Sequence, residues 1–397
     1  MTRTIPVFLA AFLLTLSAVA WPRPASAEGS TDQLFLQRQA SIQGIVVTET
    51  SAGMIGKAVD IIVTVTPQGN PETRFERKVG EQMTTSLNEA VRAVQVLHHD
   101  WDGKQLRVSF EDKYSAKDGG SAGSAYAVCF RSLLEDFAID PDYAMTGDIT
   151  VDQRVRQIGG VAAKIKGATV DGAKIVGIPA ENVDGLNDLI ILDTPQPLLE
   201  TQVFTLETLD DAVALARTDR DADLAMALNL FADLQETASR GGYRSLRNQE
   251  SKDTLSLIVE LAPNHASAQA LLDYINKQGP RHLSVTASLN EILARAQPAF
   301  FVMNQVRPGT PITAEQKRLI KEAQNDLREI RSQINPDVND FNRAMNSYVS
   351  SAKVLITNRR AGNRHIEHYN KSLANLETAY QAVSEDAKML EALIRGE

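Results

Sequence analysis

Cysteine is almost absent from this 397-residue sequence, which contains only Cys129. A single thiol cannot form an intrachain disulfide, so packed apolar cores must stabilise the folded chain. Cys129 lies in the apolar run of residues 125–130, where a buried structural thiol is expected rather than a catalytic nucleophile. A chain of this length favours an organisation into two domains.

Further absences exclude several classes of function. Lys and Arg number 41 against 50 Asp and Glu, and the net charge of −9 argues against nucleic acid as a partner. The phosphate-binding pattern Gly-x-x-x-x-Gly-Lys-Ser/Thr occurs nowhere, so we expect neither an ATPase module nor ATP binding. The sequence predicts no other cofactor and no metal. Beyond about residue 28 no run is apolar enough to span a bilayer, which predicts a soluble mature chain.

The N-terminus has the pattern of a secretory signal peptide. Arg3 is followed by an apolar run over residues 7–20 and then by Ala25-Ser26-Ala27. A basic start, a short apolar core and small residues at a cleavage site are typical of export signals, so we expect cleavage near Ala27. The apolar run is shorter than the roughly 20 residues of a spanning helix. The sequence therefore predicts an exported protein, periplasmic or extracellular, with an uncleaved anchor as the alternative.

Alternating strand and helix patterns predict an α+β domain over residues 44–218, after a leader at 28–43 that is either loose or a first strand-like arm. Runs rich in β-branched or aliphatic residues predict strands, and apolar residues spaced by three and four predict helices. The expected strands cover 42–50, 58–66, 106–110, 173–179 and 189–192, with a hairpin over 144–157 and helices over 81–97, 121–137 and 164–172.

The remainder of the chain is predicted to be all-α. Residues 219–307 form a helical region in which 259–268 weakly resembles a junction between tetratricopeptide units. The amphipathic pattern of residues 308–397 predicts a three-helix bundle or a coiled-coil-like tail. Its first helix has a capping box formed by Thr313 and Gln316. No catalytic constellation is present in these helices.

The candidate chemistry lies in two glycine-containing segments of the α+β domain. Ser121 stands in the run Asp118-Gly119-Gly120-Ser121-Ala122-Gly123, and Lys164 ends the run 158–164. A serine and a lysine can form a nucleophilic pair without histidine, provided that burial keeps the lysine neutral. Free lysine has a pKa of about 10.4, so its environment must lower that value by several units.

Residues from about 44 to 216 resemble the proteolytic domain of the Lon proteases. The matching blocks are residues 117–123, 144–150 and 158–164, which occur in the order found in that family. The resemblance implies an α+β fold similar to domain 2 of ribosomal protein S5. It also implies hydrolysis of peptide bonds in unfolded or flexible polypeptides, without the ATPase module of the family.

The same resemblance implies the site residues. Ser121 would be the nucleophile and Lys164 the general base, while the Thr146 hydroxyl would position the lysine amine. Asp118, Gly119 and Gly120 would shape the nucleophile loop and the oxyanion site. The sequence departs from the family pattern in having Gly120 where proline is common, Asp148 where glutamate is usual, and Gln153 and Ala162 where glycine and lysine are frequent.

Several other polar groups have a simpler interpretation. Lys166 is offset from the family's lysine and is expected to be solvated, and His98 and His99 before Asp100 lie at a helix end. The pair His365 and His368 has no third ligand nearby in sequence for a metal. The carboxylates at positions 210, 211, 219, 221 and 223 lack the spacing of a calcium loop.

Two alternatives to a general endopeptidase remain open. The chain could be a catalytically weak or inactive scaffold that binds a protein partner through residues 219–397. It could also cleave itself once, for example in the linker at 308–311.

Overall fold

The computed structural model describes residues 38–50, 53–66, 73–98, 105–110, 119–306, 311–358 and 361–386. The predicted signal peptide and most of the predicted leader lie outside the described residues, as does Asp118. Within these described ranges no helix is both long and apolar enough to cross a membrane.

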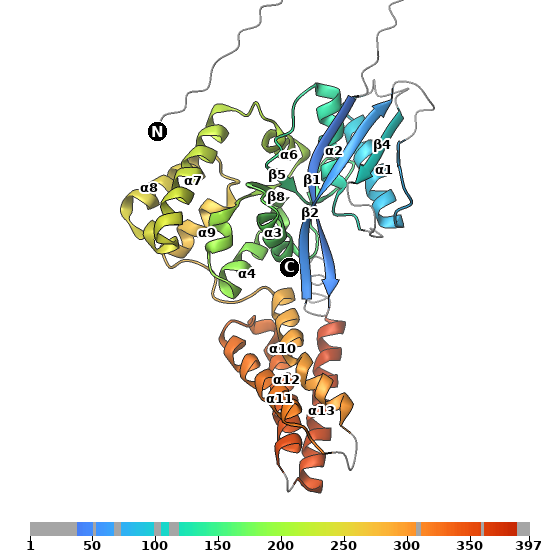
Figure 1. The fold of residues 1–397 in the computed structure, drawn as a ribbon, viewed down its shortest axis with the longest axis vertical. Helices are drawn as coiled ribbons and strands as arrows, with labels where there is room; N and C mark the ends of the chain where they lie inside the picture. The colour runs from blue at the N-terminus through green and yellow to red at the C-terminus, as the bar shows by residue number, and fades with distance from the viewer. Residues whose placement is uncertain are drawn as a thin grey trace, which may run out of the picture. The chain divides into compact units, whose positions relative to one another are not determined.

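A seven-stranded mixed sheet organises the first half of the described chain (Figure 1). Its strands lie in the order β3 (Thr73–Phe75), β4 (Gln105–Phe110), β2 (Gly53–Thr66), β1 (Arg38–Thr50), β5 (Tyr143–Met145), β8 (Ile175–Pro179) and β9 (Gln202–Leu206). Strands β4, β2 and β1 are antiparallel neighbours, whereas β1, β5, β8 and β9 run parallel. This mixed sheet and the helices that follow it agree with the predicted α+β and all-α regions.

Strand β1 begins at Arg38, so the predicted leader at 28–43 ends inside the sheet. Ala40 and Ile42 are buried while Gln39 and Ser41 are exposed. This alternation has the two-residue period of a strand and extends β1 back beyond the predicted start of the domain at residue 44.

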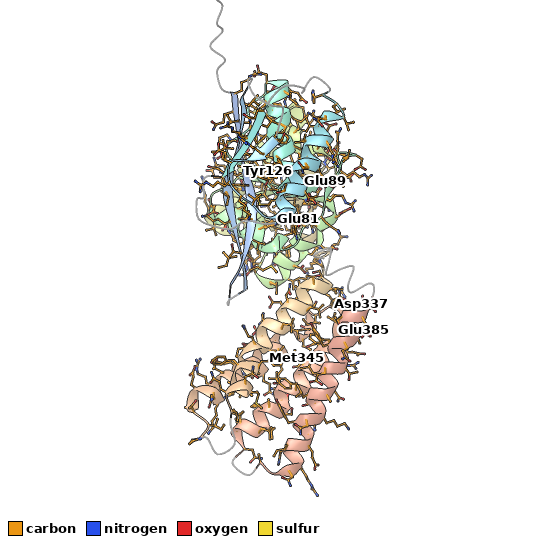
Figure 2. All side chains as sticks on the ribbon, turned by 90° about the vertical axis from the view of Figure 1, so that its right-hand side faces the viewer. Glu81, Glu89, Tyr126, Asp337, Met345 and Glu385 are labelled. Atoms are coloured by element: carbon orange, nitrogen blue, oxygen red, sulfur yellow. The ribbon has the colours of Figure 1, made fainter. Side chains whose placement is uncertain are left out.

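Helices cover both faces of the sheet. They are α1 (Glu81–Gln95), α2 (Gly123–Glu135), α3 (Val161–Val170), α4 (Asp184–Leu192), α5 (Gln196–Glu200) and α6 (Leu209–Ala216). Helices α1 and α2 share a core with Ile42, whereas α3 and α4 share another with Ile45. Positions 42 and 45 point to opposite faces of β1, which separates the two cores. Tyr126 and Cys129 of α2 are fully buried in the first core (Figure 2).

Two local predictions in this region were wrong. Residues 189–192, predicted as a strand, belong to α4, where Leu186 and Leu189 are buried at helical spacing. Short apolar runs do not distinguish a strand from a buried helix by pattern alone. The predicted hairpin over 144–157 is shorter, because Ala144 and Met145 belong to β5 and only β6 (Asp148–Ile149) pairs with β7 (Val155–Arg156).

Helices α7 (Ala222–Gly241), α8 (Gln249–Leu261) and α9 (Ala266–Ile275) pack against the sheet domain. Apolar residues of all three share the core formed by α1 and α2. The turn before α9 also covers the edge of β9. Asn264 accepts from Thr205 N–H at 2.9 Å through its carbonyl, and the Ser267 hydroxyl accepts from Val203 N–H at 2.8 Å. Exposed edge strands promote aggregation, and these contacts satisfy the edge. The α+β domain and α7–α9 therefore form one packed unit.

Within the described residues, the C-terminal bundle has one more helix than predicted. Helices α10 (Val285–Gln305), α11 (Ala314–Glu329), α12 (Asn339–Thr357) and α13 (Asn363–Glu385) share one core, which includes Ile292 of α10 and Met345 of α12 (Figure 2). The predicted boundary at residue 308 thus falls between two helices of one bundle. The predicted capping box of Thr313 and Gln316 is present.

Strand β2 and helix α3 approach each other closely through two glycines. A Cβ atom at Gly167 would overlap the Gly56 carbonyl, and one at Gly56 would overlap the Ala163 carbonyl. A Cβ atom at Gly56 would also lie 2.8 Å from Lys164 Cα, so this close approach places the lysine backbone against β2.

We expect Gly167→Ala to lower the free energy of unfolding by about 1–3 kcal/mol, because overpacking outweighs the gain of about 1 kcal/mol from alanine in a helix. Thermal or urea unfolding measures this change. The matched control is Gly279→Ala, where the nearest atom to a new Cβ is at 3.6 Å. Equal stability of the two variants would contradict the close approach.

Candidate active site

Ser121 lies in a glycine-rich turn, residues 119–123, immediately before α2. Gly119 has a φ of 134°, in the region that favours glycine, and Gly123 N–H donates to the Gly120 carbonyl at 3.1 Å. The turn thereby places half-buried Ser121 at the N-terminus of a helix. The partial positive charge of such a terminus favours negative charge that develops near it.

Lys164 is buried in the first turn of α3, with only 2% of its surface exposed. Burial lowers the pKa of its amine from 10.5 to about 7. Among the described residues no carboxylate forms an ion pair with it, so desolvation acts without a compensating charge. Lys164 can therefore exist as a neutral amine near neutral pH.

Thr146 joins the lysine to the serine-bearing turn. Its hydroxyl accepts a hydrogen bond from Lys164 Nζ at 3.1 Å and donates to the Ser121 carbonyl at 3.1 Å. The next residue reinforces this connection, since Gly147 N–H donates to the same carbonyl at 2.9 Å. The structure thus brings together three residues that the sequence singled out, from the turn before α2, the end of β5 and the start of α3.

The side chains of Ser121 and Lys164 are not joined by a hydrogen bond among those found within the described residues. The connection between the two residues runs through Thr146 to the backbone of Ser121. Catalytic hydrogen bonds are often long in an unliganded site and shorten when substrate binds, so this arrangement is compatible with a Ser–Lys pair.

The backbone near Ser121 offers free donors. In the described part of the chain, the N–H groups of Gly120, Ser121 and Ala122 make no hydrogen bond. Such donors can stabilise an oxyanion. Gly119 and Gly120 belong to this turn, whereas Asp118 lies outside the described residues.

Two further residues contact the turn and were not assigned a role from the sequence. Ser86 of α1 donates to the Gly120 carbonyl at 2.8 Å and lies 3.0 Å from Asp148 Oδ1. Burial raises the pKa of the Asp148 carboxyl, although hydrogen bonds from Ile149 N–H and Ser86 oppose the rise. The signal for Ser86 was its place on the apolar face of α1, beside Met83 and Leu87, which are also buried.

The alternative polar groups have structural contacts. Lys166 forms an ion pair with Asp193 and is partly exposed, and His98 Nε2 lies 3.1 Å from Glu135 Oε1. His365 accepts from Gly362 N–H at the start of α13.

Three carboxylates of the acidic run make local contacts. Asp211 completes a capping box on α6, Asp219 pairs with Arg217, and Asp221 caps α7. His99 and Asp100 lie outside the described residues. No group of three or more His, Cys, Asp or Glu side chains within the described ranges could hold a metal ion.

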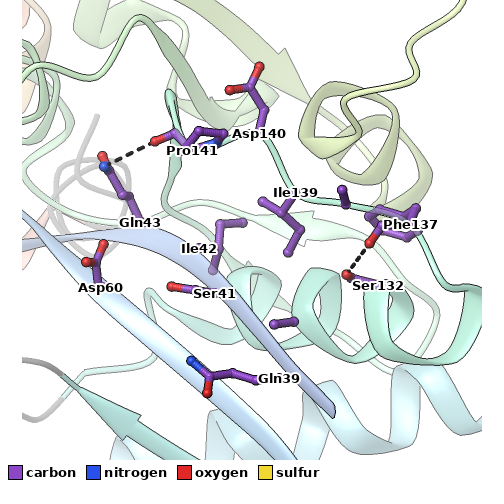
Figure 3. A pocket seen from close by; sticks show the side chains of 12 residues that line it. Gln39, Ser41, Ile42, Gln43, Asp60, Ser132, Phe137, Ile139, Asp140 and Pro141 are labelled. Atoms are coloured by element: carbon purple, nitrogen blue, oxygen red, sulfur yellow. Dashed lines mark hydrogen bonds between the residues drawn. The ribbon is translucent and has the colours of Figure 1, made fainter. Parts of the chain in front are cut away.

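A cavity of about 410 Å³ lies between β1 and residues 137–141 (Figure 3). Gln43 spans it by donating to the Pro141 carbonyl at 3.3 Å. Neither Ser121 nor Lys164 lines the cavity, so it is separate from the candidate active site.

Comparison with known families decides the assignment of this region. Residues 33–216 match the family model described as the Lon protease (S16) C-terminal proteolytic domain. The resemblance predicted from the sequence is confirmed. The match ends at the last residue of α6, so the helices from α7 onward lie outside it.

Individual relatives give the same result. The chain is 27% identical to a Lon protease of Wolbachia pipientis over 183 residues, covering 44% of this chain and 21% of the relative. An archaeal Lon protease of Methanocaldococcus jannaschii is 29% identical over 175 residues, covering 41% and 26%. A Lon protease of Paraburkholderia phytofirmans is 30% identical over 182 residues, covering 44% and 22%. The chain thus spans only about a quarter of the length of these relatives.

The buried amine of Lys164 makes stability depend on pH. Between about pH 7 and 10.5 the unfolded chain binds a proton that the folded chain does not, so stability rises with pH over this window. Near pH 6 we expect the free energy of unfolding of Lys164→Met to exceed that of the wild type by a few kcal/mol. Each unit by which the lysine pKa is lowered corresponds to about 1.4 kcal/mol. The difference should shrink towards pH 10.

Thermal unfolding at several pH values measures this prediction. The control is Lys166→Met, which removes a partly exposed lysine from the same helix. A stability difference between wild type and Lys164→Met that stays constant from pH 6 to pH 10 would show that the amine is not desolvated in the folded protein.

Proposed function

We propose that this chain is a serine endopeptidase in which Ser121 is the nucleophile and Lys164 the general base. The observation that carries the proposal is the buried Lys164 amine, whose pKa is about 7 and which Thr146 connects to Ser121. A base with a pKa near the working pH accepts a proton most effectively. The relatives named Lon proteases support a peptidase in the same region.

The proposed reaction has two halves. Lys164 accepts the hydroxyl proton as Ser121 Oγ bonds to the substrate carbonyl carbon, and the carbonyl oxygen becomes an oxyanion. The peptide C–N bond then breaks, and the leaving amine takes the proton from Lys164. Water next attacks the acyl ester with Lys164 again as base, which releases the carboxyl product and restores Ser121. The N–H groups of Gly120, Ser121 and Ala122, which make no hydrogen bond in the described part of the chain, would stabilise both oxyanions.

The edge of β1 supports an extended polypeptide as substrate. Strand β1 pairs with β5 only at Gln43 and Gly44, and the register places Thr146 directly beyond this pairing. From Ile45 onward, that edge of β1 has no partner strand among the described residues. Extended peptides commonly add to such an edge through main-chain hydrogen bonds. A folded substrate cannot present its backbone in this way.

We further propose that cleavage is independent of ATP and occurs after export. The chain has no phosphate-binding loop for an ATP-driven unfolding step, and its first residues have the pattern of a cleavable signal. Determination of the N-terminus of the protein recovered from its native cells would test export. A start near Glu28 is expected, and an intact Met1 would contradict cleavage.

A binding protein that keeps the domain as a scaffold is the second candidate. The lack of a hydrogen bond between the Ser121 and Lys164 side chains, within the described residues, is the observation that favours it. The separate core of α10–α13 could then bind a protein partner. Such a protein would capture its partner without turnover, so the activity assay below separates the two candidates.

We expect Ser121→Ala and Lys164→Ala each to reduce cleavage of casein by at least about 1000-fold, because each removes a reacting group. Wild-type cleavage should need no ATP, and a stably folded protein should resist it. Circular dichroism would verify that both variants fold. Wild-type turnover that persists in either folded variant would exclude this pair of catalytic residues.

The pH dependence of hydrolysis tests the base directly. The neutral fraction of Lys164 falls about tenfold per pH unit below its pKa, so kcat/KM should rise through acidic pH and level off above about pH 7. The measurement uses an unstructured fluorogenic peptide between pH 5 and pH 9. A profile that reaches its plateau only near the ordinary lysine pKa would contradict a desolvated base.

A further inference from the structure

Ser86 and Asp148 form a chain of contacts that ends on the peptide unit preceding Ser121. Ser86 is 2% exposed, and its hydroxyl lies 2.8 Å from the Gly120 carbonyl oxygen and 3.0 Å from Asp148 Oδ1. Asp148 Oδ1 also accepts from Ile149 N–H at 2.9 Å. Two elements far apart in sequence, α1 and β6, therefore hold one carbonyl of the glycine-rich turn.

The fit between these residues and the turn is close. A Cβ atom at Gly123 would lie 2.5 Å from Ser86 Oγ, and one at Gly120 would lie 3.0 Å from Asp148 Oδ2. A side chain at either position would push against Ser86 or Asp148, so glycine at both lets the turn pack closely on them. Glycine, however, also allows a peptide unit to rotate more freely than other residues do. The turn consequently depends on its hydrogen bonds to hold one conformation.

The carbonyl of Gly120 fixes the direction of the Ser121 N–H group. In a trans peptide unit the C=O and N–H bonds point in opposite directions. Because Ser86 and Gly123 N–H hold the carbonyl, the Ser121 N–H must point away from Ser86. Within the described residues this N–H makes no hydrogen bond, so it remains available to a ligand.

We propose that Ser86, held by Asp148, is a positioning residue that keeps the Ser121 N–H oriented as an oxyanion donor. Without the Ser86 hydroxyl, the Gly120–Ser121 peptide unit rotates more freely and the donor is no longer preorganised. This inference rests on the proposed peptidase function. It assigns to Ser86 and Asp148 a part in the reaction, although neither touches substrate.

A positioning role predicts a specific kinetic effect. We expect Ser86→Ala to lower kcat by about tenfold to a hundredfold, less than the loss of a donor itself, with KM changed by less than about twofold. A peptide boronic acid forms a tetrahedral adduct with the serine oxygen, and one of its oxygens occupies the oxyanion position. Its inhibition constant should rise by the same factor as kcat/KM falls.

Two sets of variants separate positioning from simple destabilisation. Ser132→Ala removes another buried serine hydroxyl, which lies outside the site and donates to the Phe137 carbonyl at 2.6 Å. The kcat of this control should stay within about twofold of the wild-type value. Asp148→Asn keeps an oxygen that accepts from Ile149 N–H and can share the single Ser86 hydroxyl proton with the Gly120 carbonyl, so it should retain most activity. Asp148→Ala should lose activity as Ser86→Ala does, and this pair tests the inference even if Ser86→Ala fails to fold.

The outcomes distinguish this inference from the function on which it rests. A wild-type protein that neither cleaves peptide nor binds the boronic acid would overturn the proposed peptidase itself. An active wild type with unchanged kcat and unchanged boronic acid affinity in Ser86→Ala would overturn only the positioning role. Equal losses in Asp148→Asn and Asp148→Ala would likewise exclude the hydrogen-bond relay.

Discussion

The removal of the Lys164 amine from water is the constraint on which the rest of the site depends. A charged amine in an apolar environment is costly, and the amine lowers this cost by losing its proton. Helix α3 must therefore lie tight against β2, which the glycines at 56 and 167 permit. Among the described residues, the Thr146 hydroxyl is the polar group that hydrogen-bonds to the amine. Stability near neutral pH is reduced to create a base.

Hydrogen bonds, rather than burial of the side chain, hold Ser121 in place. Its turn contains no bulky side chain, so hydrogen bonds from Ser86, Thr146 and Gly147 fix the backbone on either side of Ser121. Ser86 comes from α1, whereas Thr146 and Gly147 belong to the segment that follows β5. The sheet domain thus preorganises the site from several directions, as oxyanion stabilisation requires. The helices α7–α9 stabilise the same unit by covering the edge of β9.

The local patterns predicted most elements of the sheet domain, but they could not define its limits. The three-residue strand β5 and the strand-like run in α4 are too short for the spacing of apolar residues to distinguish a strand from a helix. The assignment of α7–α9 to the sheet domain depends on polar contacts such as Ser267 with Val203, which no periodic pattern encodes. The place of α10 in the C-terminal bundle depends on which apolar faces meet.

The sequence by itself determined the residue types of the site and the family match, because the blocks around Ser121, Thr146 and Lys164 are contiguous segments with distinctive spacing. It also determined that the chain has no disulfide of its own and no phosphate-binding loop. Only the tertiary structure decided that Lys164 is desolvated and that the Thr146 hydroxyl hydrogen-bonds both to its amine and to the Ser121 carbonyl. Burial and hydrogen-bond geometry arise from segments distant in sequence, and for the same reason only the folded chain placed Ser86 and Asp148 against the turn.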